Sequence, residues 1–124
     1  MEALVVVAAL AALAALAVRA LWDGDSPPLE VDHAEARRLP WVRVYDCREP
    51  AEWSGLLPSP SRAVRLPLAQ LVAAAKSGEI VPRRGLVLVV CRSGRRSLIA
   101  ARALRAAGYD GAVSLRGGLE AGPL

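Results

Sequence analysis

The hydrophobic positions form one long apolar run followed by shorter segments that alternate with polar ones. Residues 3–22 read ALVVVAALAALAALAVRALW, in which Arg19 is the only charged residue. A helix of about 20 apolar residues is long enough to cross the hydrocarbon core of a bilayer. We therefore predict one N-terminal transmembrane helix over residues 1–22, a linker over 23–28 and a separate domain over 29–124.

A cleaved signal peptide is the alternative interpretation of this run. Such peptides begin with a positively charged region and end in small residues at the cleavage site. Here Glu2 precedes the apolar run, and Arg19 lies beside the candidate cleavage site, so an uncleaved anchor is favoured. Because Arg19 flanks the C-terminal end of the run, the positive-inside rule places the domain of this single-pass membrane protein in the cytoplasm.

The remaining chain alternates between strand-like and helix-like patterns. Strands are predicted over 42–45, 63–66, 86–90 and 112–115, helices over 33–39, 69–76 and 97–107, and a helical turn over 49–53. Asp32 and Glu35 have capping-box spacing, and Pro40 ends the first helix. The segment 86–90 is wholly apolar, which is typical of a strand in the buried centre of a parallel sheet. This alternation predicts an α/β domain with a central parallel sheet flanked by helices.

Composition narrows the classes of function. The chain has 124 residues, which is room for one domain, and a formal net charge of +4. Its arginines lie in separated pairs and not in one basic run, so nucleic-acid binding is not indicated. One histidine, His33, and two cysteines provide no metal-ligand cluster and no disulfide framework. No metal and no organic cofactor is implied.

The candidate chemistry follows the strand 86–90. Cys91 directly follows this strand, and the next residues, which lead into the helix, are Arg92, Ser93, Gly94, Arg95, Arg96 and Ser97. Ligands of α/β sheets bind at the carboxyl ends of strands, where a loop that opens a helix points N–H groups at a bound anion. Gly94 permits a tight turn, and Ser97 is suited to cap the helix. The helix N-terminus and the arginines are expected to stabilise a Cys91 thiolate, which can attack an electrophilic sulfur and hold it as a persulfide.

Four segments in this order resemble the rhodanese homology family, from about Leu29 to the C-terminus. Residues 46–53 (DCREPAEW) look like its Asp-x-Arg-x-x-x-Glu-aromatic element, and residues 63–68 (AVRLPL) like its Ala-x-x-Ile-Pro-Leu segment. Residues 91–97 look like its active-site loop, Cys-x-x-Gly-x-Arg-Ser. The closing helix and glycine pair are matched by residues 104–108 and 115–118.

The resemblance implies a three-layer rhodanese-like fold and a sulfurtransferase activity. In such an enzyme a sulfane sulfur passes from an anionic donor such as thiosulfate to a thiophilic acceptor through a Cys91 persulfide. The acceptor is cyanide or a thiol, including a protein thiol. The loop from Arg92 to Ser97 would bind the persulfide, and Asp46 and Arg48 would support that loop.

The sequence departs from the family pattern in three places. Residues 55–57 lack the usual histidine, the loop 58–62 is longer than usual, and no tryptophan follows the glycine pair. Cys47 stands where an aliphatic residue is common; we expect it to pack in the core, with a role as a resolving thiol as the alternative.

Other functions remain open at this point. The chain could be a persulfide carrier or a non-catalytic membrane-tethered rhodanese module. A phosphatase or arsenate reductase with the Cys-x5-Arg loop is less favoured, because that loop needs an arginine six residues after the cysteine and position 97 is a serine.

Overall fold

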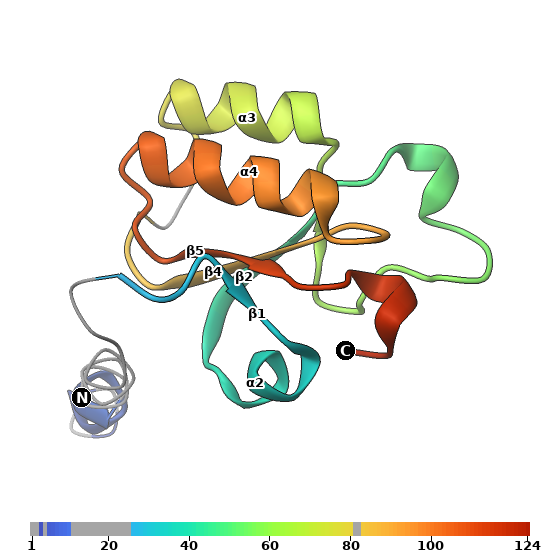
Figure 1. Ribbon diagram of the computed structural model, residues 1–124. Helices are drawn as coiled ribbons and strands as arrows, with labels where there is room; N and C mark the ends of the chain where they lie inside the picture. The colour runs from blue at the N-terminus through green and yellow to red at the C-terminus, as the bar shows by residue number, and fades with distance from the viewer. Residues whose placement is uncertain (1–2, 4, 11–25, 81–82) are drawn as a thin grey trace.

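The computed structural model describes residues 3, 5–10, 26–80 and 83–124 (Figure 1). Their helices and strands alternate along the chain. The order is β1 (Glu30–Val31), α2 (His33–Arg38), β2 (Trp41–Asp46), the 3-10 turn η1 (Pro50–Glu52), β3 (Val64–Arg65), α3 (Leu68–Lys76), β4 (Leu86–Val90), α4 (Arg95–Ala106), β5 (Ala112–Leu115) and the 3-10 turn η2 (Leu119–Ala121).

The strands form one five-stranded sheet in the order β1-β5-β4-β2-β3, and every pairing is parallel. Helices α3 and α4 cover one face of this sheet and α2 lies on the other, as Figure 1 shows. The three-layer α/β fold with a central parallel sheet is therefore confirmed.

Apolar side chains form a core on each side of the sheet. The core on the side of α3 and α4 includes Leu71, Val89 and Leu104, and the core on the side of α2 includes Val44, Leu88 and Val113. Strand β4 contributes to both cores, since successive side chains of a strand point to opposite faces. This explains why its sequence is apolar throughout.

Most predicted elements are found within one or two residues of their expected bounds. The strand β4 spans the predicted residues, and α2 begins at His33, one residue after its N-cap Asp32, whose side chain accepts a hydrogen bond from the Glu35 backbone N–H at 2.8 Å. Strand β1 was not predicted, because two residues carry no periodic pattern. Helix α4 begins at Arg95, two residues earlier than predicted.

The predicted N-terminal helix lies largely outside the described residues, which omit 1–2, 4 and 11–25. Residues 5–10 are helical, and the side chains of Val5, Val6, Val7 and Leu10 are exposed. Among the described residues, no helix combines the length and apolar character needed to cross a bilayer.

The end of the predicted linker is attached to the domain. Pro27 is buried, and its carbonyl oxygen accepts a hydrogen bond from Arg105 Nη2 at 2.7 Å. The Pro28 carbonyl accepts from the same nitrogen at 2.9 Å. The described part of the linker, residues 26–28, therefore lies against the C-terminal half of α4.

Candidate active site

Cys91 lies directly after β4, with the sheet's strands β5 and β2 on either side. Cys91 is fully buried, whereas the next two residues, Arg92 and Ser93, are exposed. Gly94 turns the chain with φ +94°, a conformation that residues with a side chain rarely adopt. The loop can therefore close over the sulfur and lead straight into α4.

Backbone and side-chain donors surround the Cys91 sulfur. The Gly94 N–H donates to Sγ at 3.1 Å and the Ser97 N–H at 3.3 Å, while Ser97 Oγ lies 3.4 Å from Sγ. Both N–H groups belong to the start of α4, where the positive end of the helix dipole also lies. The predicted anion cradle at the end of this strand is thus present in the structure.

These contacts lower the pKa of the Cys91 thiol to about 4. The largest cause is a hydrogen bond from the Cys47 thiol; the Ser97 hydroxyl and the N–H groups of Ser97 and Gly94 add to it, and burial opposes them. Cys91 is accordingly a thiolate at neutral pH. Cys47 packs in the core, as expected, and its thiol also contributes to this stabilisation.

The prediction that Ser97 caps α4 is wrong. The N-cap is Gly94, and Ser97 lies in the first turn of the helix, where it is fully buried. Its hydroxyl is 2.7 Å from Ser114 Oγ on β5, which is also buried. A hydroxyl that accepts from Ser114 can direct its own hydrogen to the Cys91 sulfur, so Ser97 serves the thiolate and not the helix end.

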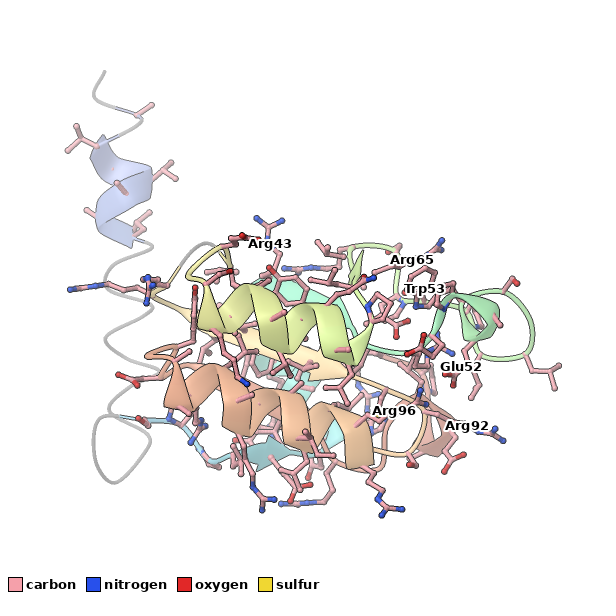
Figure 2. All side chains as sticks on the ribbon, turned by 90° about the horizontal axis from the view of Figure 1, so that it is seen from above. Arg43, Glu52, Trp53, Arg65, Arg92 and Arg96 are labelled. Carbon is pink, nitrogen blue, oxygen red and sulfur yellow. The ribbon has the colours of Figure 1, made fainter. Side chains whose placement is uncertain are left out.

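Two of the three loop arginines form ion pairs with carboxylates. Arg96 forms a two-pronged ion pair with Glu52 of η1, at 2.6 and 2.9 Å, and the two side chains face each other in Figure 2. This pair lowers the pKa of Glu52 to about 2. Arg92 pairs with Glu120 at 3.3 Å, and both are exposed. Within residues 26–80 and 83–124, no ion pair involves Arg95, which is exposed to solvent.

Asp46 and Arg48 support the site from below. Both are buried, and the Arg48 guanidinium donates to the Asp46 carboxylate at 2.8–3.2 Å. Arg48 Nη1 also donates to the carbonyl oxygens of Glu52 and Leu57, each at 2.8 Å. The pair therefore holds the segment that carries Glu52, and its link to the Cys91 loop runs through the Glu52–Arg96 ion pair.

The glycine pair supports the loop from the other side. A Cβ atom on Gly118 would lie 2.3 Å from the Arg92 carbonyl oxygen, so only glycine fits there. The N–H groups of Leu119 and Glu120 in η2 donate to the carbonyl oxygens of Cys91 and Arg92, at 2.9 and 3.0 Å. These bonds attach η2 to the backbone of the Cys91 loop.

Sequence reasoning missed Glu52, Ser114 and Gly118 as parts of the site. Glu52 and Gly118 stand in the motifs that carried the family resemblance, and that was the available signal. No sequence pattern marks Ser114, which reaches Ser97 only because β5 lies beside β4. Among the described residues, no group of three or more His, Cys, Asp or Glu side chains is arranged to hold a metal ion.

Comparison with known proteins agrees with this geometry. The sequence profile of the Rhodanese-like domain matches residues 31–122. The chain belongs to the rhodanese family. No curated protein gives a significant match.

Solved structures of other rhodanese-type proteins share the fold. The rhodanese homologue from the extremely thermophilic bacterium Thermus thermophilus is 33% identical, with a TM-score of 0.53 over 72% of this chain and 94% of its own. The human single-domain sulfurtransferase TSTD1 is 22% identical, with a TM-score of 0.59 over 74% of this chain and 92% of its own. A rhodanese-related protein from Thermoplasma volcanium is 24% identical, with a TM-score of 0.58 over 74% and 87%. This rhodanese domain therefore spans nearly the whole length of each relative.

Proposed function

We propose that this rhodanese is a sulfurtransferase that carries sulfane sulfur as a persulfide on Cys91. The observation that carries the proposal is the Cys91 sulfur itself, a buried thiol that accepts hydrogen bonds from the Gly94 and Ser97 N–H groups at a helix N-terminus. These donors stabilise the thiolate, which is the nucleophilic form of cysteine. One of the structural relatives is a human single-domain sulfurtransferase, which supports the same class of reaction.

The reaction is a two-step exchange. The Cys91 thiolate attacks the outer sulfur of a donor such as thiosulfate, the S–S bond of the donor breaks, and sulfite leaves with the bonding pair. The sulfur added to Cys91 is then anionic. Two exposed arginines of the loop, Arg92 and Arg95, favour the approach of the anionic donor before this step. A second nucleophile, cyanide or a thiol, removes the sulfur and restores the thiolate.

Sulfur transfer suits this loop better than phosphate or arsenate chemistry. A Cys-x5-Arg enzyme would hold its oxyanion with an arginine at position 97, where this chain has a serine. That serine is buried, and its hydroxyl is hydrogen-bonded to Ser114. Arg96, the preceding residue, forms an ion pair with Glu52. Both side chains already have partners in the protein, which favours sulfur transfer over binding of a tetrahedral oxyanion.

We further propose that the apolar run over residues 3–22 attaches the domain to a membrane, with the domain on the cytoplasmic side. The length of the run and the position of Arg19 support this. Extraction of cell membranes with alkaline carbonate tests the attachment: the full chain is expected to stay in the pellet and a chain lacking residues 1–22 in the supernatant. A full chain in the supernatant would contradict the anchor.

Turnover of thiosulfate and cyanide to thiocyanate tests the proposed reaction. Cys91→Ser is expected to abolish turnover, and Arg96→Ala to lower it by at least about tenfold, because a displaced loop misplaces the donors around the sulfur. Arg102→Ala, a change of an exposed arginine on α4, is the matched control and is expected to have no effect. Turnover by Cys91→Ser at the wild-type rate would overturn the mechanism.

A wild-type protein that takes sulfur from thiosulfate but turns over cyanide slowly would identify a carrier that delivers to a partner thiol. A protein that takes up no sulfur would favour the non-catalytic module.

A further inference from the structure

The two cysteines of the chain directly follow two neighbouring strands of the sheet, Cys47 after β2 and Cys91 after β4. Strand β2 pairs with β4 in parallel, with Asp46 beside Val90, and the Cys47 N–H donates to the Val90 carbonyl oxygen at 3.0 Å. Cys47 and Cys91 are therefore the next pair in the same register. Both are free thiols and both are fully buried.

The spacing of adjacent strands falls within the range of Cα distances that disulfides span. Adjacent strands lie about 4.8 Å apart, and disulfides join residues whose Cα atoms are about 4.4–6.8 Å apart. Both side chains point to the same face, since Cys47 and Cys91 belong to the core beneath α3 and α4. The interaction between the two thiols is also the largest cause of the lowered pKa of Cys91.

The interaction between the two thiols keeps Cys47 protonated while Cys91 is charged. The hydrogen bond to Cys91 raises the pKa of the Cys47 thiol, and burial raises it further. Cys47 thus holds its proton next to the sulfur that would carry the persulfide. Once the negative charge has moved to the outer sulfur of a persulfide, that proton faces a leaving group.

We propose that Cys47 is an internal acceptor that discharges the Cys91 persulfide as hydrosulfide, an activity that rests on the proposed function and extends it. Cys47 Sγ bonds to Cys91 Sγ, and the bond between Cys91 Sγ and the outer sulfur breaks. The Cys47 proton goes to the outer sulfur, which leaves as HS⁻. The two cysteine sulfurs are oxidised by two electrons in all, and the sulfane sulfur is reduced by two.

The disulfide stops the cycle until a thiol reductant reopens it. A dithiol protein or a small cellular thiol supplies the two electrons by thiol–disulfide exchange and returns Cys47 and Cys91 to the free state. Under this scheme the products are sulfide and an oxidised thiol, and no cyanide-like acceptor is needed. The rate of sulfide release then depends on the reductant and not on a sulfur acceptor.

The first test is oxidation of the cysteine pair without any sulfur donor. The full chain, purified in detergent and reduced, is treated with diamide and digested with trypsin without reduction. The tryptic peptides 44–48 and 85–92 each contain one of the two cysteines. We expect these peptides to be joined in the wild type and separate in Cys47→Ser and Cys91→Ser. If the wild type yields no disulfide-linked pair of these peptides, the proposal is overturned.

The second test follows the sulfur by intact-protein mass spectrometry after brief loading with inorganic polysulfide. The wild type is expected to release sulfide and become about 2 Da lighter than the reduced chain, as disulfide formation removes two hydrogens. Cys47→Ser is expected to keep the added mass of about 32 Da, one sulfur atom, for a time at least about tenfold longer, because the intramolecular acceptor is gone. Cys47→Ala repeats the comparison if serine disturbs the core.

The outcomes separate this proposal from the proposed function. Equal persulfide lifetimes in the wild type and in Cys47→Ser would overturn the internal acceptor and leave the sulfurtransferase intact. Diamide could join the two peptides while Cys47→Ser takes up no sulfur. This result would show that the cysteines form a disulfide but that the Cys91 persulfide does not form, and it would overturn both proposals.

Discussion

At the scale of single residues, the thiolate of this protein depends on neutral donors more than on arginines. The Cys91 sulfur is held by the Cys47 thiol, the Ser97 hydroxyl and backbone N–H groups, and its pKa falls to about 4. Two arginines of the loop have other contacts: Arg96 binds Glu52, and Arg92 binds Glu120. They hold the loop and set the charge of its surface, while the hydrogen bonds to the reactive atom come from neutral groups.

The first prediction concerns the Ser97 hydroxyl. Ser97→Ala removes a hydrogen bond to a charged group, which contributes about 1.5–3 kcal/mol. We therefore expect the midpoint of the pH profile for iodoacetamide alkylation of Cys91 to rise from about pH 4 to about pH 5 or above. Arg95→Ala, which removes an exposed charge, is the control and should leave the midpoint within a few tenths of a pH value. Equal shifts in both variants would mean that charge, and not the hydroxyl, sets the thiolate.

At the scale of elements, the Cys91 loop is held from two sides. Helix η1 reaches it through the Glu52–Arg96 pair, and the Gly117–Gly118 turn with η2 lies behind it and donates two backbone hydrogen bonds. Neither element carries the reacting atom. Both are connected to the loop only after the chain has folded, because 44 residues separate Glu52 from Arg96.

The second prediction concerns the glycine turn. Gly118→Ala places a Cβ atom 2.3 Å from the Arg92 carbonyl oxygen, so the loop must shift. We expect slower alkylation of Cys91 and a thermal midpoint lower by several degrees, which corresponds to roughly 1–3 kcal/mol of backbone strain. Gly55→Ala is the control, since Gly55 also has a positive φ but meets no atom within 4 Å. Equal alkylation rates in the two variants would contradict this role of the turn.

The third prediction concerns the pH dependence of the Glu52–Arg96 pair. Arg96 lowers the pKa of Glu52 from 4.5 to about 2 in the folded protein. Its contribution to stability is therefore present above pH 4.5 and is lost as the pH falls toward 2. We expect Glu52→Gln to unfold at lower urea than the wild type at about pH 6 and at the same urea near pH 2. A difference that is constant across this range would show that the pair does not titrate as described.

At the scale of the whole molecule, the sequence predicted the layers of the fold better than their contacts. Strand β4 was located to the residue because a strand buried on both faces must be apolar throughout. Strand β1 was missed because it has two residues, and the start of α4 was misplaced because Ser97 resembles a cap while the true N-cap is Gly94. Cys91 could be identified from its loop, whereas a link between Cys47 and Cys91 could be stated only as the alternative to packing in the core. That link depends on which strands are neighbours, and periodicity along the chain does not contain this information.

The most direct measurement is the intact mass of the full chain after a short treatment with thiosulfate. The chain has two free thiols, and we expect only Cys91 to take up sulfur. Cys47→Ser is therefore expected to gain about 32 Da, one sulfur atom, and to lose it again on addition of cyanide. Cys91→Ser is expected to gain nothing. The same gain in both variants, or no gain in Cys47→Ser, would contradict the assignment of the persulfide to Cys91.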